Sequence, residues 1–345
     1  MLYNKVIKAY KFLKYPYVYS NCLVRDLYDY MNSLNLSWRE QGNVIFGFEA
    51  YWDNISSLLY EKLGQEDKKL FVRFLLKRFF NIDTILENER DTIDEAFRKA
   101  IYVASKNEQE QSYNFFFRDH NILFTVPIRA IDPKRNELER RLIGHYEVTH
   151  AFFLLEYEKD GFNPQNGEVI LDCGAADGDT AIVFSCLYPD SKIYSFEYGE
   201  KQLEYARKNV GQNEINNVFI KSAFLYEKSG VFWADKDCVL HESKCSNGQR
   251  VETISIDDFV EQNNIENIGL IKMDIEGGEM SALRGAVRTI RKFRPLMYIP
   301  IYHLNSDLYD IPKFLHSLNF EMEFSFKWTE KIVWGVDGVL FIKFV

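Results

Sequence analysis

Residues 168–181, Glu-Val-Ile-Leu-Asp-Cys-Gly-Ala-Ala-Asp-Gly-Asp-Thr-Ala, decide the fold. The apolar start of this stretch predicts a buried strand, and Gly174 and Gly178 predict a tight turn into a helix that follows at once. Ligands in open parallel sheets bind beyond the carboxyl ends of the strands, which is where this turn lies. Glycine allows a close approach of the backbone, and free N–H groups at a helix start can receive a carboxylate. The stretch predicts a ligand-binding loop, with a purely structural tight turn as the alternative.

From Phe162 onward, short β-rich runs alternate with helical patterns, which is typical of a doubly wound parallel sheet. The predicted strands lie within residues 168–174, 192–197, 217–224, 270–276 and 296–303. Two apolar stripes predict helices, one formed by Met280, Leu283, Val287 and Ile290 and ended by Pro295, the other by Leu308, Ile311, Leu315 and Leu318. Residues 320–328 and 338–345 predict a closing antiparallel strand pair.

The region before this alternation reads as mainly helical, and we expect two parts, residues 1–150 and 151–345. In residues 71–80, Phe71, Phe74, Leu75 and Phe79 fall on one helical face, with Arg73, Lys77 and Arg78 between them. A basic aromatic helix suits a membrane surface or an anionic substrate. A core helix whose cations extend to solvent explains the same pattern and is favoured.

The composition indicates a globular protein, with 46% hydrophobic and 16% aromatic residues among 345. A formal net charge of -9 argues against a large basic nucleic-acid footprint. No apolar stretch is long enough to span a bilayer, and Lys5 and Lys8 interrupt any secretory apolar run. We therefore expect a cytoplasmic protein with reduced thiols, with no nucleic-acid partner and no integral membrane segment.

Cys238, His241 and Cys245 lie within a short loop and resemble part of a zinc site. No second cluster completes four ligands, so we predict no metal site there.

A candidate cofactor residue follows the glycine-containing loop. The second predicted strand ends in Phe196 and Glu197, about 20 residues further on, a spacing that suits hydrogen bonds from an acidic side chain to ribose hydroxyls. The loop has the spacing Gly-x-x-x-Gly and lacks the dinucleotide pattern Gly-x-Gly-x-x-Gly, which argues against a nicotinamide cofactor. Loop and acid together predict an adenosyl cofactor, although an exposed surface glutamate is the alternative for Glu197.

Three candidate catalytic residues end the fourth and fifth strands. Asp274 and Glu276 are two residues apart, so in an extended segment they project to the same side. They are candidates to orient an acceptor, to hold the amino group of a cofactor, or to bind a hard cation. His303 ends the fifth strand, and an imidazole that titrates near neutral pH suits a general base for an acceptor hydroxyl. A structural histidine is the alternative.

The chain resembles the FkbM methyltransferases from Phe162 to about Leu318. The resemblance rests on residues 169–181, 194–209, 255–259, 271–286 and 301–315. It implies a class I methyltransferase with a Rossmann-like, doubly wound sheet that uses S-adenosyl-L-methionine. The cofactor contacts that we expect are at Asp172, Gly174, Ala175, Asp177, Gly178, Asp179, Thr180, Glu197, Tyr198, Ala223 and Asp274. Two departures are Tyr198, where the family commonly has proline, and the segment 326–328, which lacks a histidine-containing pattern.

The expected activity is O-methylation of a sugar hydroxyl in glycan biosynthesis, on a glycan precursor or a nucleotide-activated sugar. His303 is the expected base, and Asp274 and Glu276 are expected to position the acceptor, directly or through a divalent cation. One alternative is methylation of a hydroxyl of a polyketide or other small molecule. Another is a non-catalytic sensor or scaffold that binds S-adenosylmethionine, and a nicotinamide-dependent oxidoreductase is disfavoured. The sequence leaves homo-oligomerisation open.

Overall fold

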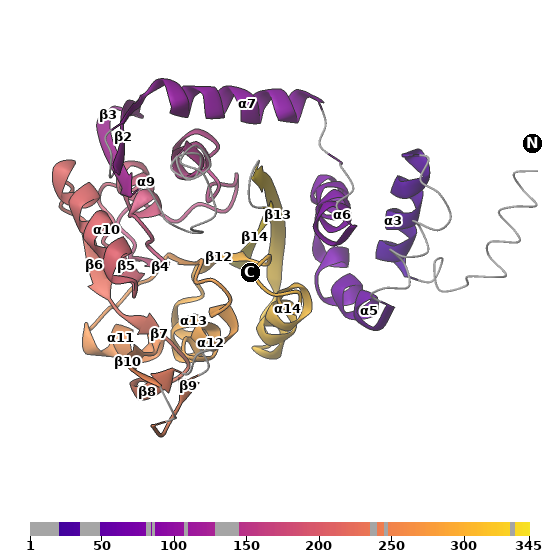
Figure 1. The fold of residues 1–345 in the computed structure, drawn as a ribbon. Helices are drawn as coiled ribbons and strands as arrows, with labels where there is room; N and C mark the ends of the chain where they lie inside the picture. Colours follow the sequence, from indigo (N-terminus) through magenta and orange to yellow (C-terminus); the bar gives the residue numbers. More distant parts are fainter. Residues whose placement is uncertain are drawn as a thin grey trace, which may run out of the picture.

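The computed structural model describes residues 21–34, 49–80, 84, 87–106, 110–127, 145–234, 240–244, 248–331 and 335–345. Its centre is a seven-stranded sheet in the order β13-β14-β12-β11-β4-β5-β6 (Figure 1). The strands are β4 (Ile170–Cys173), β5 (Ile193–Glu197), β6 (Val218–Ser222), β11 (Leu270–Met273), β12 (Leu296–Pro300), β13 (Met322–Lys331) and β14 (Gly335–Phe344).

The strand directions confirm the predicted fold class. Neighbouring strands from β6 through β5, β4 and β11 to β12 run parallel, whereas β14 is antiparallel to both β12 and β13. Every residue of β4 and β11 is buried, as expected for central strands covered on both faces. Their carboxyl ends therefore meet at one edge of the sheet, next to those of β5 and β12.

The helices of this part are α9 (Asp179–Leu187), α10 (Glu200–Gln212), α11 (Ile256–Gln262), α12 (Glu279–Arg284), α13 (Val287–Phe293) and α14 (Asp307–Ser317). The stripe from Met280 to Ile290 does not form the single helix that its spacing predicts, because the helix breaks at Gly285. The carbonyl oxygen of Tyr226 lies only 2.3 Å from where a Cβ on Gly285 would be, and the carbonyl of Gly285 accepts from the N–H of Asp257. A tertiary contact thus ends α12.

The N-terminal region contains α3 (Cys22–Ser33), α5 (Glu49–Leu58), η1 (Tyr60–Lys62), α6 (Gln65–Phe80) and α7 (Glu87–Tyr102), as predicted for a mainly helical region. Helix α6 lies beside β13 and β14 (Figure 1). The rings of Phe71 and Phe74 pack edge-on against Phe326 at centroid distances of 5.1 and 5.2 Å. Asp67 accepts from the hydroxyl of Ser325 and the N–H of Phe326. The prediction that α6 is a core helix is confirmed, but the expectation that its cations extend to solvent is wrong for Arg73, whose side chain is buried and pairs with Glu89.

Two small sheets were not predicted. One consists of β1 (Ala104–Lys106), β2 (Glu110–Phe117) and β3 (His120–Pro127), and the other of β7 (Phe224–Leu225), β8 (Gly230–Ala234), β9 (Leu240–His241) and β10 (Gln249–Ile254). The first joins the N-terminal region to α10, because the buried side chain of Asn209 exchanges two hydrogen bonds of 2.8 Å with the backbone of Thr125. Residues 149–153 form a short π-helix, η2, that packs against α9.

No helix among the residues that the structure describes is long and apolar enough to cross a membrane.

Candidate functional site

The loop after β4 has a backbone that only glycine accommodates. Gly174 and Gly178 have φ values of 92° and 88°, in the left-handed region. A Cβ on Gly174 would lie 1.7 Å from the carbonyl oxygen of Asp274, and one on Gly178 would lie 3.1 Å from the Cα of Ala206. The N–H groups of Gly174 and Ala175 both donate to the carbonyl of Phe196. The loop is therefore held between the ends of β5 and β11.

A buried ion pair lies beneath this loop. The ammonium of Lys272 is 3.1 Å from Oδ1 of Asp172 and donates to the carbonyl of Gly174 at 2.7 Å. Burial alone would lower the pKa of Lys272, but the carboxylates of Asp172, Asp274 and Asp179 outweigh it and raise the pKa above its usual range. Oδ1 of Asp172 also accepts from the hydroxyl of Thr180. Lys272 thus ties β4, β11 and the loop together.

Sequence reasoning gave Lys272 no role. The sequence did carry one signal for a buried charge, which is that Lys272 lies within the otherwise apolar run 270–273.

Glu197 sits at the same edge of the sheet, at the end of β5. Its carboxylate accepts from the backbone N–H groups of Ala176 at 3.0 Å, Tyr198 at 2.8 Å and Gly199 at 2.7 Å. Its carbonyl accepts from the N–H of Ala223. A carboxylate has about four lone-pair sites, so these donors orient it and leave acceptor capacity for a ligand hydroxyl.

The remaining predicted cofactor residues lie at the start of α9. Asp177 and Asp179 are buried, and Oδ1 of Asp179 accepts from the N–H of Thr180 at 2.7 Å. Burial, with the nearby carboxylate of Glu147, raises the pKa of Asp179 to about 8. The structure thus brings the predicted cofactor residues together around one loop.

Asp274 lies beyond β11 and is held by two phenols. The hydroxyl of Tyr157 donates to its Oδ2 at 2.6 Å, and that of Tyr302 to its Oδ1 at 3.3 Å. Burial, reinforced by the carboxylate of Asp274, raises the pKa of both tyrosines well above the ordinary value. Both phenols therefore stay protonated and act as donors. Tyr157 was missed from the sequence, because it lies before the first strand and carries no motif.

The structure brings the three predicted catalytic residues together. Nε2 of His303 lies 3.4 Å from Oδ1 of Asp274 and 3.5 Å from Oε2 of Glu276. The side chain of His303 is 6% exposed, whereas that of Glu276 is 90% exposed. The buried carboxylate of Glu279, the first residue of α12, lies 2.8 Å from Nδ1 of the same ring. Sequence reasoning gave Glu279 no role, although it follows Asp274 and Glu276 in the same segment.

The acid–base state of His303 differs from the expected titration near neutral pH. Burial lowers the pKa of the imidazole, but the contact with Glu279 and the charge of Asp274 raise it to about 9 overall. In the unliganded protein the ring is therefore mainly an imidazolium at pH 7. Action as a base requires the deprotonated form, which becomes abundant only in alkaline solution.

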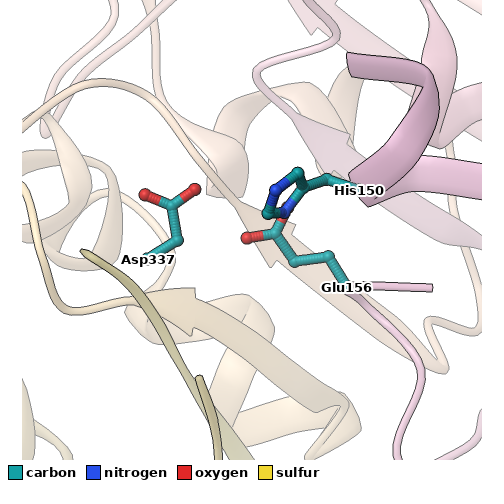
Figure 2. A group of neighbouring side chains, drawn as sticks. All are labelled: His150, Glu156 and Asp337. Atoms are coloured by element: carbon teal, nitrogen blue, oxygen red, sulfur yellow. The ribbon is translucent and has the colours of Figure 1, made fainter. Parts of the chain in front are cut away.

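A second histidine–carboxylate cluster lies nearby. Figure 2 shows His150 and Glu156 close to Asp337, which comes from β14. All three are buried, and one ligand atom from each lies within 4.8 Å of the others, as also holds for Asp274, Glu279 and His303. The N–H of Glu156 donates to the carbonyl of His150, which fixes these two neighbours.

Of the zinc-like residues Cys238, His241 and Cys245, only His241 lies within the described residues, in β9.

Comparison with known proteins identifies the domain. Residues 172–322 match the methyltransferase FkbM domain. The 2-O-methyltransferase NoeI of Sinorhizobium fredii is 24% identical over 195 residues, which cover 51% of this chain and 79% of NoeI.

Among solved structures, the methyltransferase FkbM of Methylobacillus flagellatus has 19% identity and a TM-score of 0.42, over 58% of this chain. The match spans only 54% of that protein. TYW2 of M. jannaschii, solved in complex with AdoMet, has 12% identity and a TM-score of 0.37, over 70% of this chain and 87% of its own. Residues 172–322 thus match a methyltransferase FkbM domain, and this match together with NoeI supports a methyltransferase.

Proposed function

We propose that the protein transfers the methyl group of S-adenosylmethionine to a hydroxyl of a sugar, on a glycan precursor or a nucleotide-activated sugar. The observation that supports the proposal most strongly is the contact between His303 and Asp274 at the carboxyl ends of the strands, next to the glycine-containing loop. A hydroxyl acceptor needs a group that removes its proton during transfer, and an imidazole beside a carboxylate is such a group.

The residues of the loop fit an adenosyl cofactor. Gly174 and Gly178 let the loop turn with positive φ values while its backbone packs against Asp274 and Ala206, and Oδ2 of Asp172 is buried without a hydrogen-bond partner among the described residues. We infer that Glu197 receives the ribose hydroxyls and that the N–H groups at the start of α9 face the methionine carboxylate. The cofactor supplies a methyl group on a positively charged sulfur.

His303 and Asp274 would have different roles towards the acceptor hydroxyl. Asp274, fixed by Tyr157 and Tyr302, orients the acceptor hydroxyl. When bound, S-adenosylmethionine would supply the methyl group to the hydroxyl oxygen and leave as S-adenosylhomocysteine, and Nε2 of His303 would take the hydroxyl proton. Because the resting ring is protonated, this step requires loss of a proton from His303 to solvent beforehand. Turnover should therefore increase as the pH rises towards 9.

The relative NoeI supports oxygen as the methylated atom, since its name describes a 2-O-methyltransferase. Glu276 is exposed at the rim of the site, where it can contact an acceptor that enters from solvent.

Binding and turnover test the proposal separately. Calorimetric titration should show binding of S-adenosylmethionine and S-adenosylhomocysteine, weakened in Glu197→Ala, and none of NAD. Release of S-adenosylhomocysteine should then be measured with free monosaccharides, nucleotide sugars and phenolic or polyketide hydroxyls. We expect turnover with a sugar that His303→Ala abolishes with nearly unchanged cofactor affinity. Turnover retained in His303→Ala would remove it from the base role.

A further inference from the structure

The buried carboxylate of Glu279 joins two strand ends. Glu279 begins α12, just after β11, and its side chain is fully buried. Its Oε1 accepts from the backbone N–H of Ile275 at 3.0 Å, which fixes the carboxylate relative to the loop after β11. The same oxygen lies 2.8 Å from Nδ1 of His303, beyond β12.

The two ring nitrogens of His303 face different carboxylates. Nδ1 faces Glu279, whereas Nε2 faces Asp274 and Glu276. The nitrogen of a neutral imidazole that carries the proton is set by the partner of the other nitrogen. A carboxylate at Nδ1 keeps the proton there, so that Nε2 is the nitrogen free to accept one. The Nδ1–H direction is not aligned with Glu279 as in an ideal hydrogen bond, and such contacts often tighten when substrate binds.

We propose that Glu279 is a positioning residue for the methyl transfer: it holds the proton on Nδ1 of His303 and thereby presents Nε2 to the acceptor hydroxyl. This role rests on the proposed function, in which His303 is the base. The residue touches neither cofactor nor acceptor and acts only through the imidazole.

Burial supports this role for Glu279. Its second oxygen, Oε2, is buried without a hydrogen-bond partner among the described residues. A buried carboxylate with an unsatisfied oxygen is costly, and such costs concentrate at functional sites. Glu276, by contrast, is exposed and faces the other ring nitrogen, so it cannot fix the tautomer in the same way.

The other titratable groups near the imidazole of His303 have partners or protonation states of their own. Asp307 of α14 accepts from the N–H of Leu304, and burial raises its pKa to about 6. Arg78 of α6 lies near Asp307 and bonds Asn305. Tyr302 stays protonated. The carboxylate at Nδ1 is that of Glu279, so a variant at Glu279 tests that nitrogen selectively.

The first arm of the experiment needs no acceptor. Histidine ring signals are followed by NMR against pH in the wild type, with His303→Ala to assign the signal of His303. We expect an inflection near pH 9 in the wild type, with nitrogen shifts above it that place the proton on Nδ1. In Glu279→Gln the inflection should fall by at least about one pH unit and the tautomer preference should weaken. An unchanged inflection and tautomer would overturn the role.

Two control variants show whether the effect of Glu279→Gln depends on the position of the carboxylate at Nδ1 or only on the loss of a negative charge. Glu276→Gln removes a carboxylate at Nε2 that is exposed, and should move the inflection less than Glu279→Gln without altering the tautomer. Glu66→Gln removes a remote carboxylate that is 84% exposed, and the inflection of His303 should stay at the wild-type pH. If Glu279→Gln fails to fold, Glu279→Asp keeps the charge but withdraws it by one methylene. It should weaken the Nδ1 preference, and a wild-type tautomer in this variant would equally refute the role.

The second arm uses the sugar that supports turnover in the wild type. In Glu279→Gln, kcat measured in alkaline solution, where the ring is deprotonated in both proteins, should fall by about 10²-fold while the affinity for S-adenosylmethionine stays unchanged. The inflection of kcat/KM with pH should shift downward. Turnover that survives in His303→Ala would refute the proposed base. Turnover lost in His303→Ala but unaffected in Glu279→Gln would leave the base in place and refute only the positioning role.

Discussion

Replacing Lys272 with methionine tests the buried ion pair that holds the glycine-containing loop after β4. The side chains of Lys272 and Asp172 are 2% and 0% exposed, so solvent hardly screens their 3.1 Å contact. Removing one partner of such a pair typically destabilises a protein by about 3–5 kcal/mol, because the other charge stays buried. The loss should exceed that of an ordinary core substitution of conserved volume, about 1.5 kcal/mol or less.

The assay is urea unfolding followed by circular dichroism, for Lys272→Met, Asp172→Asn and the double variant. We expect Lys272→Met to lose about 3–5 kcal/mol, and the double variant to lose less than the sum of the single ones by about 0.5–3 kcal/mol. Affinity for S-adenosylmethionine should also decrease in Lys272→Met, because the carbonyl of Gly174 loses its donor. A loss below about 1 kcal/mol, or additive effects, would refute the reasoning.

Three further predictions concern the same edge of the sheet. Because the folded pKa of His303 is raised to about 9, its stabilising contribution is fully present below pH ~6.5 and is lost as the pH rises through about 9. The difference in Tm between wild type and His303→Gln should therefore shrink from pH 6 to pH 10, and a constant difference would contradict the shift. Turnover should be insensitive to EDTA, since Asp274 and Glu279 already accept protein donors, whereas loss on chelation and recovery with Mg²⁺ would favour the divalent cation. Gly174→Ala should abolish cofactor binding in calorimetry, because its Cβ would overlap the carbonyl of Asp274, and wild-type affinity would show that the loop can move aside.

Much of the site was predictable because strand ends are visible in the sequence. Apolar runs ending at Cys173, Glu197 and Met273 predict parallel strands, and the carboxyl ends of such strands meet at one edge. The contact of His303 with Asp274 follows from the same geometry. The expected extended segment from Asp274 to Glu276 is wrong, because β11 ends at Met273 and Glu276 lies in the turn that follows with a φ of 55°, from which it reaches the imidazole.

Contacts that depend on tertiary packing were not predictable. The break at Gly285 arises from the carbonyl of Tyr226, far away in the sequence, and the raised pKa of His303 depends on the buried Glu279. Tyr157 reaches Asp274 from a segment without any motif. The alternation in β2, where Tyr113, Phe115 and Phe117 are buried, was a readable strand signal within a region that otherwise reads as helical.

The most direct test of the central claim is transfer of a deuterated methyl group from S-adenosylmethionine to a panel of nucleotide sugars and monosaccharides, with the product analysed by mass spectrometry and NMR. The account predicts a methyl group on a sugar oxygen, formed faster as the pH rises towards 9 and not formed by His303→Ala. A methyl group on nitrogen or carbon, or cofactor binding without transfer to any sugar while another class of hydroxyl is methylated, would contradict it.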